Sequence, residues 1–178
     1  MTTCALLIVK RKSKRLPNKN ILPINGEPMF LTNVRKCRKI FDRVYVSSDS
    51  TEILKQAMEV GAVSIKRPKN LCGSTPNIFV YRHALDRILE DKIVAVQANS
   101  PTVKPDLIHL VMDLMKTKEE VMTCHSNYKP YGSVWGLTKD RIKNYGNPRK
   151  PTPEVLIVDT SIDIHNESDY QEVLKYYE

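Results

Sequence analysis

Cys4-Ala-Leu-Leu-Ile-Val9 is an unbroken apolar run near the start of the chain, and its length fits one strand buried on both faces. A polar loop follows it. The next segment, residues 28–40, carries Met29, Val34 and Cys37 at roughly helical spacing, with basic residues on the other side. A buried strand, a loop and an amphipathic helix are the start of an α/β fold.

The same alternation continues towards the C-terminus. We expect further strands at residues 43–47, 63–66, 92–97, 120–125 and 155–158 and further helices at 50–60, 75–89, 104–116 and 167–177. Gly61 is placed to end the helix at 50–60, and Thr75 to cap the helix that follows, with Pro76 in its first turn. Between residues 126 and 154 proline and glycine punctuate the chain and the pattern loosens. The sequence predicts three layers, a mostly parallel twisted sheet with helices on both faces.

The composition is that of a soluble globular protein, with 41% hydrophobic and 27% charged residues. At 178 residues the chain suits a single domain with a real core. Its first apolar run is too short for a membrane span or a signal peptide, and Lys10, Arg11 and Lys12 follow it directly. We therefore predict a cytoplasmic protein with no membrane partner.

Four cysteines are scattered along the chain without a CxxC pair: Cys4, Cys37, Cys72 and Cys124. This pattern predicts neither a zinc site nor a disulfide framework, and buried free thiols explain it best. Cys124 precedes His125, but neighbouring residues on a strand point to opposite faces, which argues against a nucleophilic pair.

The net charge of +8 is partly local, because six basic residues fall between Lys10 and Lys19. Such a loop suits a polyphosphate ligand or nucleic acid, and a solvated basic surface is the plain alternative. The aromatic content of 7% and the lack of any nucleic-acid motif argue against a nucleic-acid partner. The loop has neither GxGxxG nor GxxxxGK[ST], so its side chains would have to hold the phosphates.

Ser13-Lys-Arg-Leu-Pro-Asn-Lys-Asn20 resembles the signature loop of the acylneuraminate cytidylyltransferases, the CMP-sialic acid synthetases and their legionaminate and pseudaminate relatives. The resemblance continues in order through Gly26-Glu-Pro28, residues 41–50, Arg67-Pro68, His83-Ala-Leu85, Gln97-Ala-Asn-Ser-Pro101 and residues 162–169. It implies a Rossmann-like nucleotide-diphospho-sugar transferase fold. It also implies Mg²⁺-dependent transfer of CMP from CTP to an acidic sugar of the nonulosonic type, with release of pyrophosphate.

The resemblance implies roles for individual residues. Those that would bind the nucleotide are Lys10, Ser13, Lys19, Asn20, Arg67 and Ser74. Arg11, which has no counterpart in the family, is expected to bind it as well, because it belongs to the same cation-dense loop. Lys19 would lie beside the α-phosphate, and Arg67 and Ser74 near the cytosine. Gln97 would lie between nucleotide and sugar and, with Lys10 and Lys19, form the catalytic group. Asp163 matches the first of two carboxylates that bind Mg²⁺, and His165 stands at the position of the second.

The residue types suit this chemistry. A sugar hydroxyl attacks the α-phosphorus and pyrophosphate leaves, so negative charge must be stabilised on phosphate oxygens in the transition state. Lysines supply part of that stabilisation. Mg²⁺ prefers oxygen ligands and keeps several waters, so one or two carboxylates suffice to hold it.

Three departures from the family keep alternatives open. Arg11 and Lys12 replace small or neutral residues. His165 is a poorer magnesium ligand than aspartate. The region around 126–154, which carries sugar-binding and dimerisation elements in the family, is short. A homodimer is expected from the family. The alternatives are another nucleotidyltransferase acting on a different acidic sugar or an alditol phosphate, and a non-catalytic nucleotide-binding homologue.

Several of these residues also have plainer interpretations. Gln97 can satisfy backbone groups at a strand end, and Asp163 can cap the last helix. For Lys14 and Arg15, a solvated side chain and a ligand-binding role are equally good interpretations. Asp49 is expected to be structural, hydrogen bonding within its turn. Tyr131 and Trp135 are expected to pack in the core or at its rim.

Overall fold

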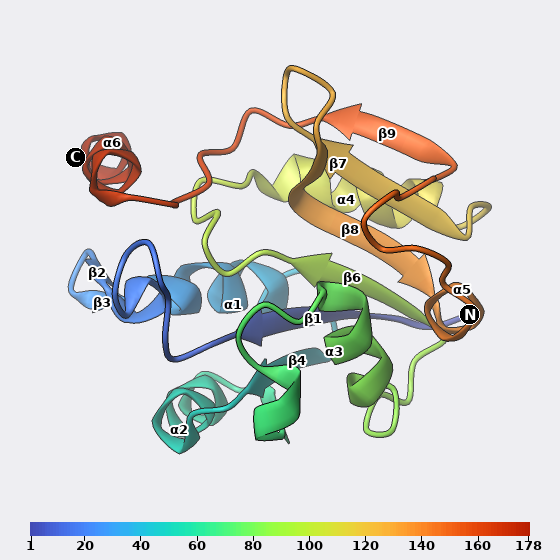
Figure 1. The fold of residues 1–178 in the computed structure, drawn as a ribbon, viewed down its shortest axis with the longest axis horizontal. Helices are drawn as coiled ribbons and strands as arrows, with labels where there is room; N and C mark the ends of the chain where they lie inside the picture. The colour runs from blue at the N-terminus through green and yellow to red at the C-terminus, as the bar shows by residue number, and fades with distance from the viewer.

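A seven-stranded sheet runs through the computed structural model, which describes all 178 residues. The strands, in the order in which they lie side by side, are β5 (Val63–Lys66), β4 (Val44–Ser48), β1 (Thr3–Val9), β6 (Lys92–Val96), β8 (Pro130–Thr138), β7 (Glu120–Cys124) and β9 (Val155–Val158). Only β8 runs against its neighbours β6 and β7. The mostly parallel sheet is therefore confirmed, and the parallel strands end at one common edge (Figure 1).

Helices cover both faces of the sheet, as the sequence predicts (Figure 1). On one face pack α1 (Met29–Arg38), α2 (Thr51–Glu59) and α4 (Pro105–Leu114); on the other pack α3 (Asn77–Ala84) and α5 (Lys139–Lys143). β1 serves both cores, because Ala5 and Leu7 join the first and Cys4 and Leu6 the second. Burial on both faces is why its sequence is apolar without alternation.

The ends of α2 are formed as the sequence indicates. The Ser50 hydroxyl accepts a hydrogen bond from the Ile53 amide and caps the first turn. At the other end Gly61 has φ +84°, and its amide and that of Ala62 donate to the carbonyls of Met58 and Ala57. This pair of bonds is a Schellman motif, so the prediction that Gly61 ends the helix is confirmed.

The expected start and end of α3 are wrong by a few residues. The helix begins at Asn77 with Pro76 at the cap position, and it ends at Ala84. The Thr75 hydroxyl donates to the Cys72 carbonyl instead of capping the helix. The chain beyond Ala84 continues in turns, in which the Ile88 amide still bonds the Ala84 carbonyl.

β8 and α5 lie in the segment where the sequence pattern loosens, and neither was expected. Gly132 and Gly136 are part of the reason, since glycine is unusual inside a strand. A Cβ at Gly132 would lie 2.5 Å from Thr123 Oγ1, and one at Gly136 would lie 2.7 Å from Met115 Cγ. These glycines allow β8 to pack closely against β7 and α4.

A last helix, α6 (Glu167–Tyr177), lies beyond the edge where the parallel strands end (Figure 1). It packs in a small core of its own with Leu16, Ile24, Met29 and Ile164, through Tyr170 and Val173. Ile24 belongs to a short hairpin of β2 (Pro23–Ile24) and β3 (Glu27–Pro28). The C-terminal helix thus covers the loop that follows β1.

All four cysteines are free, and three of them are buried. Burial raises the pKa of the Cys37 thiol to about 12, so it stays protonated at neutral pH. No helix in the structure is long and apolar enough to cross a membrane.

Candidate functional site

A polar cavity of about 210 Å³ lies at the edge where the parallel strands end. Ligands of open α/β sheets bind at this edge. Its lining comes from the loop after β1, from the end of β5, from the start of α3, from the segment after β6 and from the turn before α6. The residues are Ile8, Lys10, Arg15, Lys19, Asn20, Arg67, Leu71, Gly73, Thr75, Asn77, Val80, Gln97, Asn99 and His165.

The lining of the cavity is strongly cationic. It contains four basic side chains, those of Lys10, Arg15, Lys19 and Arg67, and no aspartate or glutamate. Four side-chain amides also line it: Asn20, Asn77, Gln97 and Asn99. A cavity with this lining favours a ligand that carries several negative charges and many hydrogen-bonding groups.

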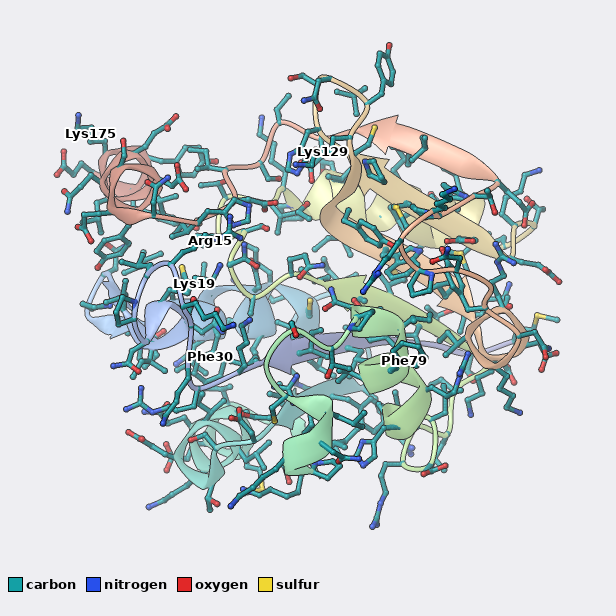
Figure 2. The ribbon with its side chains drawn as sticks, viewed as in Figure 1. Arg15, Lys19, Phe30, Phe79, Lys129 and Lys175 are labelled. Carbon is teal, nitrogen blue, oxygen red and sulfur yellow. The ribbon has the colours of Figure 1, made fainter.

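Lys19 is the most buried of the lysines in this cavity, with 8% of its surface exposed. Its Nζ donates to the Ile164 carbonyl oxygen at 2.6 Å. Burial, reinforced by repulsion from Arg15 and Lys10, lowers the pKa of Lys19 to about 8. Figure 2 shows Lys19 and Arg15 together at this edge of the sheet. An anionic ligand would relieve the repulsion among these cations.

Arg67 is a buried arginine in the cavity lining. Its Nη2 donates to the Val9 carbonyl at 3.1 Å and lies 3.7 Å from Asp49 Oδ1. Its Nε is buried and has no partner. A buried donor without a partner is costly, so this nitrogen is suited to a ligand acceptor.

Asp49 has a structural role, as the sequence indicates, but its carboxylate contacts residues outside its own turn. Besides facing Arg67, its Oδ1 accepts a hydrogen bond from the Arg11 amide at 3.0 Å. The Arg11 guanidinium is directed to Glu52, with Nε 3.8 Å from Oε2, and does not line the cavity. A second bond, from Asn20 Nδ2 to the Lys10 carbonyl at 2.9 Å, ties the two ends of the loop together.

Asp163 lies beside the cavity rather than in its lining. Its Oδ1 accepts a hydrogen bond from the Ser100 hydroxyl, and its Oδ2 is 3.6 Å from His125 Nε2. Burial raises the pKa of the Asp163 carboxyl above its ordinary value. This carboxylate offers the oxygen ligand that Mg²⁺ prefers, and the metal's other ligands would then be phosphate oxygens and water.

His165 lines the cavity and faces a cation. Its Nδ1 lies 3.2 Å from Arg15 Nη2. Burial, followed by the charges of Lys19 and Arg15, lowers the pKa of His165 below its ordinary value. No three His, Cys, Asp or Glu side chains lie close enough together to enclose a metal ion. Of the two residues predicted to bind the metal, Asp163 fits Mg²⁺ better than His165 does.

The structure brings together most of the residues that the sequence singled out. Six of them line the cavity: Lys10, Lys19, Asn20, Arg67, Gln97 and His165. Four do not: Arg11, Ser13, Ser74 and Asp163. Arg15, which the sequence left open, lines it, as do Asn77 and Asn99, which sequence reasoning missed. Asn99 could have been found, because it lies within the Gln97–Pro101 motif.

An aromatic pocket of about 180 Å³ adjoins the polar cavity and shares Asn77 with it. Tyr131, Trp135, Pro148 and Arg149 line it. Trp135 is otherwise core, 2% exposed, with its Nε1 donating to Glu120 at 2.9 Å and its ring packed edge-on against Tyr131. The core-or-rim interpretation of both aromatics agrees with this placement.

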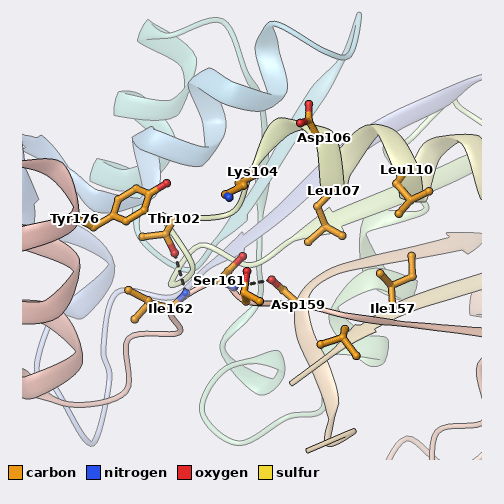
Figure 3. Close-up of a pocket in the computed structure, with 12 residues that line it drawn as sticks. Thr102, Lys104, Asp106, Leu107, Leu110, Ile157, Asp159, Ser161, Ile162 and Tyr176 are labelled. Atoms are coloured by element: carbon orange, nitrogen blue, oxygen red, sulfur yellow. Dashed lines mark hydrogen bonds between the residues drawn. The ribbon is translucent and has the colours of Figure 1, made fainter. Parts of the chain in front are cut away.

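A third hollow, about 450 Å³, lies between α4, the end of β9 and α6 (Figure 3). Thr160, Ser161 and Ile162 line it, just before the segment that carries Asp163 and His165. Asp159 on its wall accepts hydrogen bonds from the amides of Ser133 at 2.7 Å and Ser161 at 2.8 Å. Asp159 thereby ties the start of the Thr160–Ile162 segment to β8.

Comparison with known proteins points to one family. A family model described as Cytidylyltransferase matches residues 5–141. A 3-deoxy-manno-octulosonate cytidylyltransferase from a Nitratiruptor species is 32% identical over 120 residues, which cover 66% of this chain and 50% of that protein. Pseudaminic acid cytidylyltransferase from Campylobacter jejuni is 27% identical over 117 residues, covering 61% and 50%. The chain spans about half the length of these curated relatives.

Solved structures show the same fold. A CMP:2-keto-3-deoxy-manno-octonic acid synthetase complexed with CTP superposes with a TM-score of 0.79 at 12% identity, covering 99% of this chain and 98% of that one. The Mycobacterium tuberculosis protein Rv0371c in complex with manganese gives 0.73 at 15% identity, covering 98% and 99%. These likenesses establish the α/β nucleotidyltransferase fold over the whole of the present chain.

Proposed function

The chain belongs to the cytidylyltransferase family, and from that premise we propose that it transfers CMP from CTP to an acidic sugar and releases pyrophosphate. The observation that carries the proposal is the cavity with four cations and no carboxylate in its lining. That lining complements a triphosphate. The acceptor class is a 2-keto sugar acid, either nonulosonic or 3-deoxy-octulosonic, since relatives named for both are similar to this chain.

The proposed roles follow from the contacts. Lys10 and Lys19 neutralise charge on the phosphates as the sugar hydroxyl attacks the α-phosphorus and pyrophosphate leaves. Arg67, whose buried Nε has no partner, binds an acceptor atom on the nucleotide, with Ser74 near the base. Gln97, at the end of β6, orients the acceptor sugar beside the nucleotide.

We propose Mg²⁺ as the cofactor and Asp163 as its protein ligand. When bound, the ion withdraws negative charge from the phosphate oxygens. Ser100 and His125 hold the Asp163 carboxylate in place through the contacts described above. Manganese in the similar Rv0371c supports a divalent ion. A role for His165 as second metal ligand, and roles for Arg11 and Ser13 in nucleotide binding, stay predictions.

The broader sequence-based predictions are retained as part of the proposal. They are a single nucleotidyltransferase domain over residues 1–178 with a short substrate and dimerisation region around 126–154, a homodimer, no nucleic-acid partner and a cytoplasmic location, where CTP is made. Nucleic-acid strands bind along extended, exposed grooves, whereas the cations of this chain line a small cavity.

The test is pyrophosphate release from CTP and Mg²⁺ with a panel of acceptors: N-acetylneuraminate, legionaminate, pseudaminate and 3-deoxy-manno-octulosonate. We expect release with one acceptor, a preference for CTP over UTP, ATP and GTP, and loss of at least about 100-fold in Asp163→Ala. Asp113→Ala removes an exposed carboxylate on α4 and serves as the matched control.

Two outcomes would contradict the proposal. Equal turnover of all four nucleotides would remove CTP as the substrate. CTP binding without pyrophosphate release across the panel would favour the non-catalytic nucleotide-binding homologue. An alditol phosphate assayed beside the panel tests the other acceptor class: release with it alone would keep the enzyme class and change the acceptor.

A further inference from the structure

We propose that His165 is a positioning residue for Arg15: its Nδ1 accepts a hydrogen bond from the guanidinium and holds it in the cavity, where Arg15 binds the nucleotide phosphates without a metal ion. The inference rests on the proposed function, because it takes CTP as the ligand. It assigns His165 a role that does not involve metal binding and gives Arg15 a definite one.

The geometry of the pair fixes its chemistry. Arg15 Nη2 and His165 Nδ1 are 3.2 Å apart, although the residues are 150 positions apart in sequence. A guanidinium has only donors, so Nδ1 must be the acceptor and the imidazole proton resides on Nε2. Nδ1 therefore accepts the hydrogen bond from Arg15, and a neutral imidazole is paired with a charged guanidinium.

The backbone around His165 is fixed on both sides. Its amide donates to Asp169 Oδ2 at 2.7 Å, the oxygen that also accepts the Asn166 amide in the capping box at the start of α6. Ile164, directly before it, is fully buried, and its carbonyl accepts the bond from Lys19. The imidazole is thus presented from a rigid segment, whereas Arg15 comes from an exposed position of the loop.

A neutral partner matters for the charge of the cavity. A carboxylate at position 165 would pair with Arg15 in a charge-assisted, potentially bidentate contact and cancel one of the four cations. A histidine holds the guanidinium while leaving its charge available. Because no carboxylate lines the cavity, Arg15 has no stronger competitor there than an incoming phosphate.

The experiment measures CTP affinity by calorimetry in EDTA, so that no divalent ion contributes. We expect Arg15→Ala to weaken binding about tenfold or more, as loss of a charge-assisted hydrogen bond would. His165→Leu should weaken it by a similar factor. His165→Asn should stay within about threefold of the parent protein, because the asparagine Oδ1 lies near the position of Nδ1 and accepts the same bond.

Two further variants sharpen the test. His165→Asp should bind CTP more weakly than His165→Asn in EDTA, because the carboxylate neutralises Arg15. Lys14→Ala is the matched control: Lys14 is the exposed neighbour of Arg15 and does not line the cavity, so its loss should leave affinity unchanged within about twofold. Melting temperatures of all variants check that the fold is intact.

The double variant Arg15→Ala/His165→Leu should bind no more weakly than Arg15→Ala alone, because both changes remove the same contact. Additive losses, or parent-like affinity in His165→Leu, would overturn the positioning role. If the parent protein fails to bind CTP, the proposed function itself fails, and inorganic tripolyphosphate then tests the Arg15–His165 pair by the same comparisons.

Discussion

Lys19 is a cation buried among other cations, so its pKa is lowered and the stability of the fold depends on pH. Its pKa of about 8 lies below the ordinary value of 10.5, so the folded protein releases this proton before the unfolded chain does. Below pH 8 both states are protonated and the folded state carries the full cost of the buried charge. Raising the pH from about 8 to 10.5 removes that cost, so this group alone makes stability rise with pH.

Binding of CTP is expected to show the opposite trend. Deprotonation of Lys19 removes a charge from the phosphate site, so CTP affinity should fall as the pH rises through about 8. Lys19→Arg should flatten this fall, because arginine stays protonated throughout. Calorimetric titrations between pH 6.5 and 9.5 would measure it.

Lys36→Met is the control for this titration. Burial also lowers the pKa of Lys36 to about 8, but its Nζ bonds the carbonyls of Pro101 and Val103, away from the cavity lining. The pH dependence of CTP binding should therefore survive in Lys36→Met. If the pH dependence disappeared in Lys36→Met, the titrating group would be Lys36 rather than Lys19.

At the scale of single residues, the sequence indicates that the loop after β1 lines the cavity but not which of its cations do so. Arg11 and Arg15 are indistinguishable as cations in one loop. Only the fold brings Glu52 to Arg11 and His165 to Arg15, and the second of these partners comes from the other end of the chain. Lys10 and Lys19, singled out from their positions in the motif, both line the cavity.

At the scale of an element, the end of α2 depends on one backbone conformation. Gly61→Ala places a Cβ at φ +84°, where L-residues are strained, and 3.3 Å from Arg38 Nε. We expect a loss of about 1–2 kcal/mol in the free energy of unfolding, measured in urea. Gly146→Ala is matched to it, since that glycine lacks a positive φ and a Cβ there would meet nothing within 4 Å. Equal losses in both variants would contradict the Schellman assignment.

Elements with a strong local signal were predicted and those with a tertiary cause were not. β1 and α2 follow from an apolar run and from Ser50 and Gly61 as caps. β8 could not be predicted, because its glycines make sense only once Thr123 and Met115 lie against them. The β2–β3 hairpin is different: Asn25-Gly26, with φ of 50° and 79°, is a strong type I′ turn signal, so this hairpin is predictable from the sequence.

At the scale of the whole molecule, the site joins the two ends of the chain. The loop after β1 supplies Lys19, and the turn before α6 supplies the Ile164 carbonyl that Lys19 bonds. The small core beneath them contains Leu16 from the loop and Val173 from α6. Docking of the C-terminal helix and order in the loop after β1 are therefore expected to be coupled.

Val173→Ala tests this coupling, because Val173 is fully buried in that core. We expect the free energy of unfolding to fall by about 2 kcal/mol and amide exchange at Ile21 and Leu22, whose amides bond the Asn18 and Lys19 carbonyls, to accelerate. CTP at a hundredfold excess over its Kd should raise the free energy of unfolding of Val173→Ala by roughly 2.7 kcal/mol. Glu172→Ala, on the exposed side of α6, should change neither quantity. If Val173→Ala lowered stability while exchange in the loop stayed at the parent rate, the packing of α6 would not determine order in the loop, and the coupling would be contradicted.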